Sequence, residues 1–168
     1  MPRELRLPVL LLSTFAALVA VVAQPAPAMA QDDDEPMAVS AQIVAPQNDK
    51  PGMLVVALKI ERPWHTYSIT QPKGGPFTTR IKLAEHKTAK VGSFTSTTKH
   101  EVHFDEDFKM NVEVHRDQVV WVAPLSLPEG TDWGSLEISG AVIAQACKVG
   151  ACLPPADYAF VAKLTPAN

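Results

Sequence analysis

The sequence predicts an all-β fold, either a sandwich or a barrel, and three features of its pattern support this. Apolar and polar residues alternate with a period of two in several short segments, as in half-buried strands. Proline and glycine recur at short intervals, with eleven of the fifteen prolines and all eight glycines lying after residue 30. Beyond residue 30, no segment keeps a helical period of about 3.6 over three turns. Many short strands divided by turn residues are typical of all-β domains.

The expected strands can be placed in order along the chain. Clear alternation predicts strands at 54–60, 79–83, 110–115 and 158–164. Apolar stretches between them predict further strands at 64–69, 119–127 and 136–146. The turn residues that separate these segments include Pro46, Pro51, Pro63, Pro72, Gly74, Gly75, Pro76, Gly92, Pro128, Gly130 and Gly134. The sequence contains no internal repeat, so a single domain is expected over residues 37–168.

The first thirty residues have the composition of a secretory signal peptide. Two arginines open the chain, an apolar run covers 7–23, and small residues lead to a cleavage site after Ala30. We therefore expect residues 1–30 to be removed and the protein to be periplasmic or secreted. Residues 31–36 contain four consecutive acidic residues and are expected to be a disordered leader. An uncleaved membrane anchor is the alternative, although the apolar run is short for a membrane span.

Charge and motif content exclude several classes of function. Fifteen basic and eighteen acidic side chains give a net charge of −3, which disfavours nucleic-acid binding. After the signal peptide, no apolar run approaches the roughly 20 residues that a membrane span needs. The sequence has no glycine-rich phosphate loop and no nucleophile elbow, and we expect no cofactor.

The two cysteines, Cys147 and Cys152, are separated by four residues that include Gly150. In an oxidising compartment they should be able to pair, and the spacer suits a four-residue hairpin loop that places them opposite each other. Opposed residues in antiparallel strands have Cα atoms roughly 4.5–5.5 Å apart, within reach of a disulfide. Alternation along 136–146 places Cys147 on the more polar face, accessible to a partner thiol. The neighbouring Lys148 would favour its thiolate.

The cysteine pair has three possible roles: redox exchange, structural support or metal binding. Closing a loop of about six residues contributes about 2 kcal/mol on the chain-entropy model, against nearly 5 kcal/mol for about 100 residues. The small contribution favours exchange and leaves the structural role open. A metal site would join the cysteines to histidines or use His100, His103, His115 and Met110. We expect no metal and take the histidines as solvated loop residues: His65, His86, His100, His103 and His115.

The acidic run Asp105, Glu106 and Asp107 is a second candidate for chemistry near the thiols. A nearby carboxylate raises the pKa of a thiol and can relay protons. The alternative interpretation is a solvated turn with no functional role.

Several segments resemble the N-terminal periplasmic domain of the DsbD family of thiol:disulfide interchange proteins. The most specific is Gln-Ala-Cys-x4-Cys-Leu-Pro-Pro at 145–155, which follows a β-rich region. The segment 63–67 resembles the aromatic strand of that family. Residues 106–108 and 112–114 resemble its cap segment and the following strand, and 125–130 resembles the approach to the cysteine hairpin. The likeness covers most of residues 39–164.

The resemblance implies an immunoglobulin-like β-sandwich that carries one exchangeable disulfide. Cys147 and Cys152 would be the redox pair, Phe108 the aromatic cap, and Tyr67 a residue that lines the site. The residues alone leave open which cysteine attacks, whereas the resemblance points to Cys152 as the one bonded to partners. Where some members carry a second aromatic residue after the cap, this chain has Lys109.

The resemblance also implies partners. They are a thioredoxin-like electron donor and periplasmic disulfide-containing proteins, such as disulfide isomerases and cytochrome c maturation thioredoxins. We expect a free-standing version of the domain, whose donor is another protein. The alternative function is a non-enzymatic immunoglobulin-like binding module in which the disulfide is structural.

Overall fold

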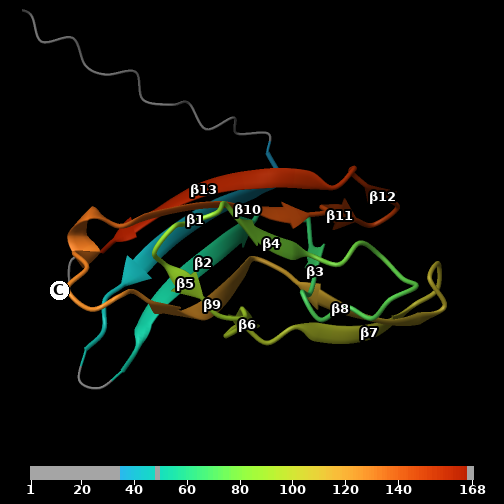
Figure 1. The fold of residues 1–168 in the computed structure, drawn as a ribbon. Coiled ribbons are helices and arrows are strands. Elements are labelled where there is room, and N and C mark those ends of the chain that lie inside the picture. Colours follow the sequence, from blue (N-terminus) through green and yellow to red (C-terminus); the bar gives the residue numbers. More distant parts are fainter. Residues whose placement is uncertain (1–34, 48–49, 166–168) are drawn as a thin grey trace, which may run out of the picture. The chain divides into compact units, whose positions relative to one another are not determined.

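The described chain is almost entirely β-structure, as the sequence predicts. The structure is a computed structural model that describes residues 35–47 and 50–165. Within those ranges the only helical segment is one 3₁₀ turn, η1 (Trp133–Ser135) (Figure 1). The expected signal peptide and residues 31–34 of the expected leader lie outside the described residues. No helix in the described ranges is long and apolar enough to cross a membrane.

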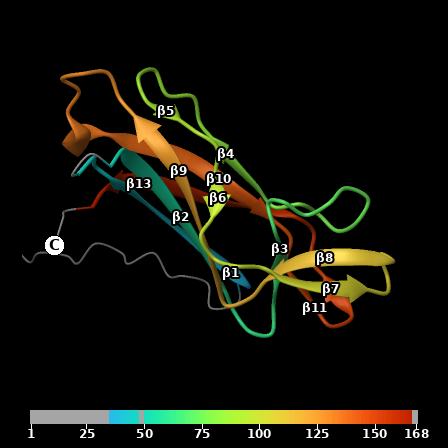
Figure 2. The same cartoon turned by 90° about the horizontal axis from the view of Figure 1, so that it is seen from below.

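Eight strands form the larger sheet. They are β1 (Met37–Val44), β2 (Gly52–Ile60), β4 (Arg80–Leu83), β5 (Lys90–Val91), β6 (Thr95–Ser96), β9 (Gln118–Ser126), β10 (Glu137–Ala144) and β13 (Ala156–Leu164). Their order is β4-β10-β13-β1-β2-β9-β5, with β6 also paired to β9. The β1–β13 pair is parallel and the other pairs are antiparallel. The sheet curls, so that its β10–β13 part and its β2–β9 part form two layers (Figure 2).

The apolar faces of these two layers enclose one hydrophobic core. In β2, Leu54, Val56 and Leu58 are fully buried, whereas the residues between them are partly exposed. Trp121 of β9 and Val142 of β10 belong to the same buried cluster. Because both layers contribute to a single core, the fold is an immunoglobulin-like β-sandwich.

A three-stranded sheet and a short hairpin complete the described structure. The sheet contains β3 (Thr66–Tyr67), β8 (Met110–His115) and β7 (Glu101–Asp105), in the order β3-β8-β7. The hairpin contains β11 (Cys147–Lys148) and β12 (Ala151–Cys152). An antiparallel bridge between His65 and Cys147 joins the hairpin to the residue that precedes β3. A second buried cluster lies here, made of Tyr67, Val112, Val114 and Cys147, with Met110 packed against it.

The observed strands agree with the predicted ones where alternation is clear. The predicted strand 110–115 coincides with β8, and the other predicted strands each overlap an observed one. In the segment 64–69, only Thr66 and Tyr67 form a strand. The sequence analysis did not identify β7, whose apolar residues Val102 and Phe104 point outward and are 59% and 55% exposed.

Candidate functional site

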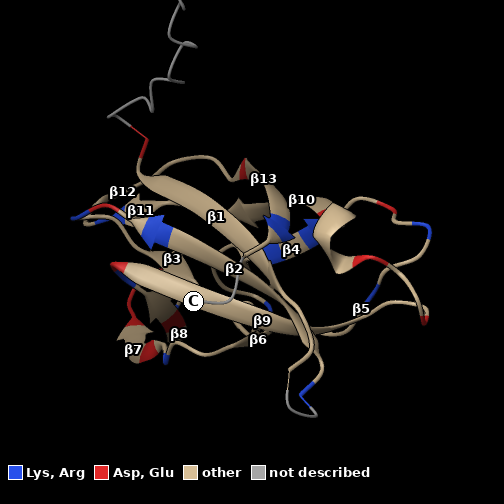
Figure 3. Cartoon of the chain, turned by 90° about the vertical axis from the view of Figure 1, so that its left-hand side faces the viewer, with Lys and Arg blue, Asp and Glu red and all other residues tan. Residues whose placement is uncertain are grey.

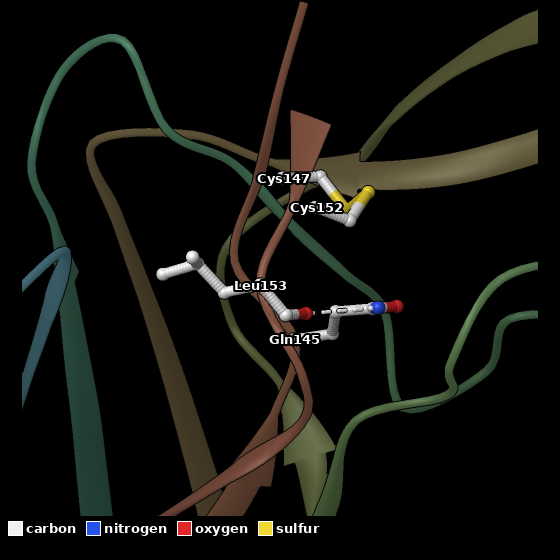
Figure 4. Close-up of a disulfide and its surroundings, with 4 residues drawn as sticks. All are labelled: Gln145, Cys147, Cys152 and Leu153. Carbon is white, nitrogen blue, oxygen red and sulfur yellow. Dashed lines mark hydrogen bonds between the residues drawn. A yellow bond between two sulfur atoms is a disulfide. The ribbon is translucent and has the colours of Figure 1, made fainter. Parts of the chain in front are cut away.

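The two cysteines form a disulfide across the β11–β12 hairpin, as the sequence predicts. Cys147 lies directly opposite Cys152, with a Cα–Cα distance of 4.1 Å and an S–S bond of 2.04 Å (Figure 4). The loop is tighter than expected, because Lys148 and Ala151 also pair and leave only two residues in the turn. Gly150, in that turn, has a positive φ of 72°, which glycine adopts without a steric penalty.

The two sulfur-bearing residues differ in their exposure to solvent. Cys147 is 1% exposed and packs with Tyr67, whereas Cys152 is exposed. The expectation that Cys147 lies on an accessible polar face is therefore wrong. The alternation of β10 ends at Ala144, and both Ala146 and Cys147 are buried, so the parity of the strand does not continue into the hairpin.

Two hydrogen bonds fix the hairpin against the residues that flank it. The side-chain amide of Gln145 donates to the carbonyl of Leu153 at 3.0 Å (Figure 4). The backbone N–H of Leu153 donates to the carbonyl of Ala146 at 2.9 Å. The segments before and after the hairpin are therefore hydrogen-bonded to each other, which fixes the position of the hairpin and of Cys152 at the surface.

The disulfide lies in a cleft of about 480 Å³ that most of the predicted site residues also line. The predicted residues that line it are Cys147, Cys152, Tyr67, Asp105, Asp107 and Phe108. Glu106 does not line it, because its side chain points to Lys109 and forms an ion pair at 2.9 Å. The cleft also includes residues that the sequence analysis did not assign to the site: Pro63, His65, His103, Arg116, Lys148, Val149, Gly150 and Ala151.

The loop between β7 and β8 carries the expected cap residue, and Asp105 shapes it. One carboxylate oxygen of Asp105 accepts the backbone N–H groups of Asp107 at 2.9 Å and of Phe108 at 3.1 Å. This arrangement is typical of acidic turn residues and fixes the position of Phe108. Phe108 is 39% exposed, so its ring lines the cleft without being fully buried.

Tyr67 and His65 occupy the floor of the cleft next to Cys147. Tyr67 is 3% exposed, and its ring meets that of His65 edge to face at 5.5 Å. Burial raises the pKa of the Tyr67 phenol, and the nearby Asp105 carboxylate raises it further. The backbone of His65 exchanges two hydrogen bonds with that of Cys147, at 2.8 and 2.9 Å.

The His65 imidazole is neutral at physiological pH. Burial, together with a smaller effect of the positive charge of Arg116, lowers its pKa to about 4. The sequence analysis took His65 for a solvated loop residue. The signal that identifies it is the spacing of two from Tyr67, which places both side chains on one face of the extended segment.

The histidines that were considered above as metal ligands lie in different surroundings. Within residues 35–47 and 50–165, no three His, Cys, Asp or Glu side chains are grouped so as to hold a metal ion. His100 and His115 have ring centroids 6.0 Å apart, while His103 lines the cleft. His115 is 1% exposed in β8, so the expectation of a solvated loop residue is wrong for it.

Comparison with known proteins places the chain in a family. No curated protein matches it. One family matches residues 30–163, and its description is the N-terminal part of the thiol:disulfide interchange protein DsbD. The matched residues cover the whole sandwich and the cysteine hairpin. The sandwich fold, the disulfide hairpin and this match together show that the chain belongs to the family of DsbD N-terminal domains.

Proposed function

We propose that this protein exchanges its Cys147–Cys152 disulfide with thioredoxin-like proteins in the periplasm or another exported compartment. The observation that carries the proposal is a hairpin disulfide in a cleft with one buried and one exposed sulfur-bearing residue. The family of thiol:disulfide interchange domains supports it. The signal-peptide composition of residues 1–30 supports export.

Exposure decides which sulfur a partner attacks. A thiolate of a reduced partner reaches Cys152, because Cys152 is exposed whereas Cys147 is 1% exposed. The new bond joins the partner sulfur to Cys152, and the electron pair of the broken bond remains on Cys147 as a thiolate. The second partner thiolate then attacks its own neighbouring sulfur and releases Cys152. Two electrons pass from the partner dithiol to this protein, and the opposite order of steps returns them.

The cleft supplies a cover and proton acceptors for these steps. Phe108 lies at the disulfide and limits the approach of small thiols, and a docking partner displaces it. Asp105 and Asp107 line the same cleft and are placed to carry protons to and from the two thiols. Glu106 is not needed for this role, because its carboxylate is paired with Lys109 outside the cleft.

A single-turnover reaction with an activated partner tests the proposal. The partner is a thioredoxin-like protein that keeps only its nucleophilic cysteine, joined in a disulfide to a coloured aryl thiol. Cys147→Ala leaves the Cys152 thiol, which should displace the coloured aryl thiol and form a disulfide-linked complex with the partner. Dithiothreitol should reduce that complex. Cys152→Ala leaves the buried Cys147 thiol, and its reaction rate should be lower than that of Cys147→Ala by a factor of about ten or more.

The two variants differ by one sulfur position and so serve as controls for each other. A faster reaction of Cys152→Ala would refute the assignment of Cys152 as the attacked sulfur. If neither variant forms a covalent complex, the exchange function is wrong and the disulfide belongs to a binding module.

A further inference from the structure

Four residues of the cleft lie in one row across neighbouring chain segments. Cys152 pairs with Cys147, and Cys147 forms the isolated bridge with His65. Thr66 pairs with His115, so the next position of the same antiparallel register sets His65 beside Arg116. Directly opposed antiparallel residues point to the same face, and all four of these side chains line the cleft. Figure 2 shows β3, β8 and β11 at the same end of the molecule.

The row brings Arg116 within reach of Cys147. Two neighbouring positions across the row separate their Cα atoms by roughly 10 Å, and an extended arginine side chain covers most of that distance. Between them lies His65, whose pKa of about 4 keeps its ring neutral. At neutral pH the positive charge in this row is therefore that of Arg116, and His65 contributes none.

Titratable and charged groups come from every element around the cleft. Those that line it are Tyr67 of β3, His103 and Asp105 of β7, Asp107 of the cap loop, Arg116 beyond β8 and Lys148 of β11, while Glu101 of β7 pairs with Arg116. Figure 3 shows acidic residues gathered at β7 and β8. The carboxylates would raise the pKa of a thiol, and the cations would lower it, so the local balance decides the sign.

The charge balance changes across the cleft. At His65, which is bridged to Cys147, Arg116 affects the pKa more than Asp105 does and more than Glu101 does, each taken singly. At Tyr67, two residues further along, the effect of Asp105 exceeds that of Arg116. Arg116 therefore has the strongest single charge effect on the side of the cleft next to Cys147, and Asp105 has it at Tyr67.

Lys148 is adjacent to Cys147 in sequence but is directed elsewhere. Its ammonium nitrogen lies 4.6 Å from the centre of the Trp64 ring, as in a cation–π contact. Lys148 also points to the other face of β11 from Cys147, because successive residues of a strand alternate. Arg116, rather than Lys148, is therefore the cation that shares a face with Cys147.

We propose that Arg116 stabilises the thiolate of Cys147 that is released when a partner attacks Cys152. This inference rests on the proposed exchange function, since it assigns the residue that receives the displaced charge. When the Cys147–Cys152 bond breaks, its electron pair moves onto the Cys147 sulfur and no proton is taken up. The guanidinium holds that negative charge inside the cleft until the thiolate is protonated or attacks the mixed disulfide again and expels the partner thiolate.

The test is a pH titration of the Cys147 thiol in the fully reduced protein, followed by the NMR shift of its β-carbon. Arg116→Gln should move the titration midpoint to higher pH by about 0.5–1, which is a threefold to tenfold higher proton affinity. Arg116→Lys should restore most of the wild-type midpoint, because it keeps the charge. Glu101→Gln should move the midpoint to lower pH, because Glu101 lies 3.4 Å from the guanidinium of Arg116 and opposes it.

Lys148→Gln is the matched control and should move the midpoint of Cys147 less than Arg116→Gln does, because the Lys148 ammonium is held against the Trp64 ring. An unchanged midpoint in Arg116→Gln, or an equal change in Lys148→Gln, would overturn the proposal. The side chain of Arg116 is 42% exposed, so these variants should fold. If Arg116→Gln does not fold, the opposite shift in Glu101→Gln decides the question. The titration needs no partner protein, so failure of the exchange reaction would leave its result intact.

Discussion

His115 is an uncommon residue for the interior of a β-sandwich. It is 1% exposed, and neither ring nitrogen has a hydrogen-bond partner in the described structure. Its ring packs edge to face against Trp121 at 6.5 Å and against His100 at 6.0 Å. Burial is the main cause that lowers its pKa to about 4; the neighbouring His100 acts in the same direction and Glu113 in the opposite one. The fold therefore holds His115 in its neutral form.

The depressed pKa of His115 predicts a loss of stability in acid. The unfolded chain binds a proton near the ordinary pKa of 6.5, whereas the folded chain does so only near 4. The free energy of unfolding should therefore fall as pH drops from 6.5 to 4, by up to about 3 kcal/mol from this residue. Urea unfolding at several pH values in this range measures it.

His115→Leu separates this effect from that of His65, which has a similar pKa. The variant should lose about half of the pH dependence, and it should keep or gain stability at neutral pH because it removes an unpartnered buried polar group. A variant that follows the wild-type curve throughout the acid range would contradict this explanation.

The residues of the site divide into those that the sequence predicts and those that it does not. The cysteines, Tyr67 and Phe108 were identified because they are chemically distinctive or match the family pattern. His65 was not identified, although its spacing of two from Tyr67 is a local signal. Arg116 was not identified either, because its place beside His65 and Cys147 comes from the register between separate segments. A pairing between segments this far apart in sequence leaves no local signal.

At the scale of elements, the β7–β8 hairpin carries both Phe108, the proposed cap residue, and the acidic residues Asp105 and Asp107 that line the cleft. Alternate residues of β7 face opposite ways, so His103 and Asp105 line the cleft while Phe104 faces outward. β8 was predicted from its alternation because its inner residues, Val112 and Val114, are buried. β7 was not predicted, although residues 101–105 also alternate between polar and apolar side chains, and in the structure its apolar side chains are on the exposed face.

The cap position predicts that Phe108→Ala speeds the reduction of the disulfide by a small thiol such as dithiothreitol. Removing the ring opens the cleft next to Cys152, so the rate should rise several-fold. The free energy of unfolding should fall by only about 1–2 kcal/mol, because Phe108 is 39% exposed. Stopped-flow fluorescence or quenched alkylation measures the rate.

Phe104→Ala is the matched control, because the same side chain is removed from the same hairpin but from the face away from the cleft. It should leave the reduction rate unchanged. Equal rates for wild type and Phe108→Ala would remove Phe108 from the cap. Equal acceleration in both variants would show that the hairpin acts through its stability.

At the scale of the whole molecule, the sandwich does not depend on its disulfide. One core cluster joins both layers, and it contains neither cysteine. The Cys147–Cys152 bond connects paired strands of one hairpin, so it closes a short loop and contributes only about 2 kcal/mol by chain entropy. The general fold follows from the alternation of β2, β4, β8 and β13, which is local information. The cleft does not, because it forms where three separate segments meet.

The reduction potential of the Cys147–Cys152 pair tests the central claim most directly. Equilibration of the whole protein with a thioredoxin-like protein of known potential, followed by alkylation of free thiols, gives the value. An exchange disulfide should fall between about −270 and −120 mV, the span of thioredoxin-fold exchange proteins. A value below about −300 mV, where structural disulfides lie, would contradict the account.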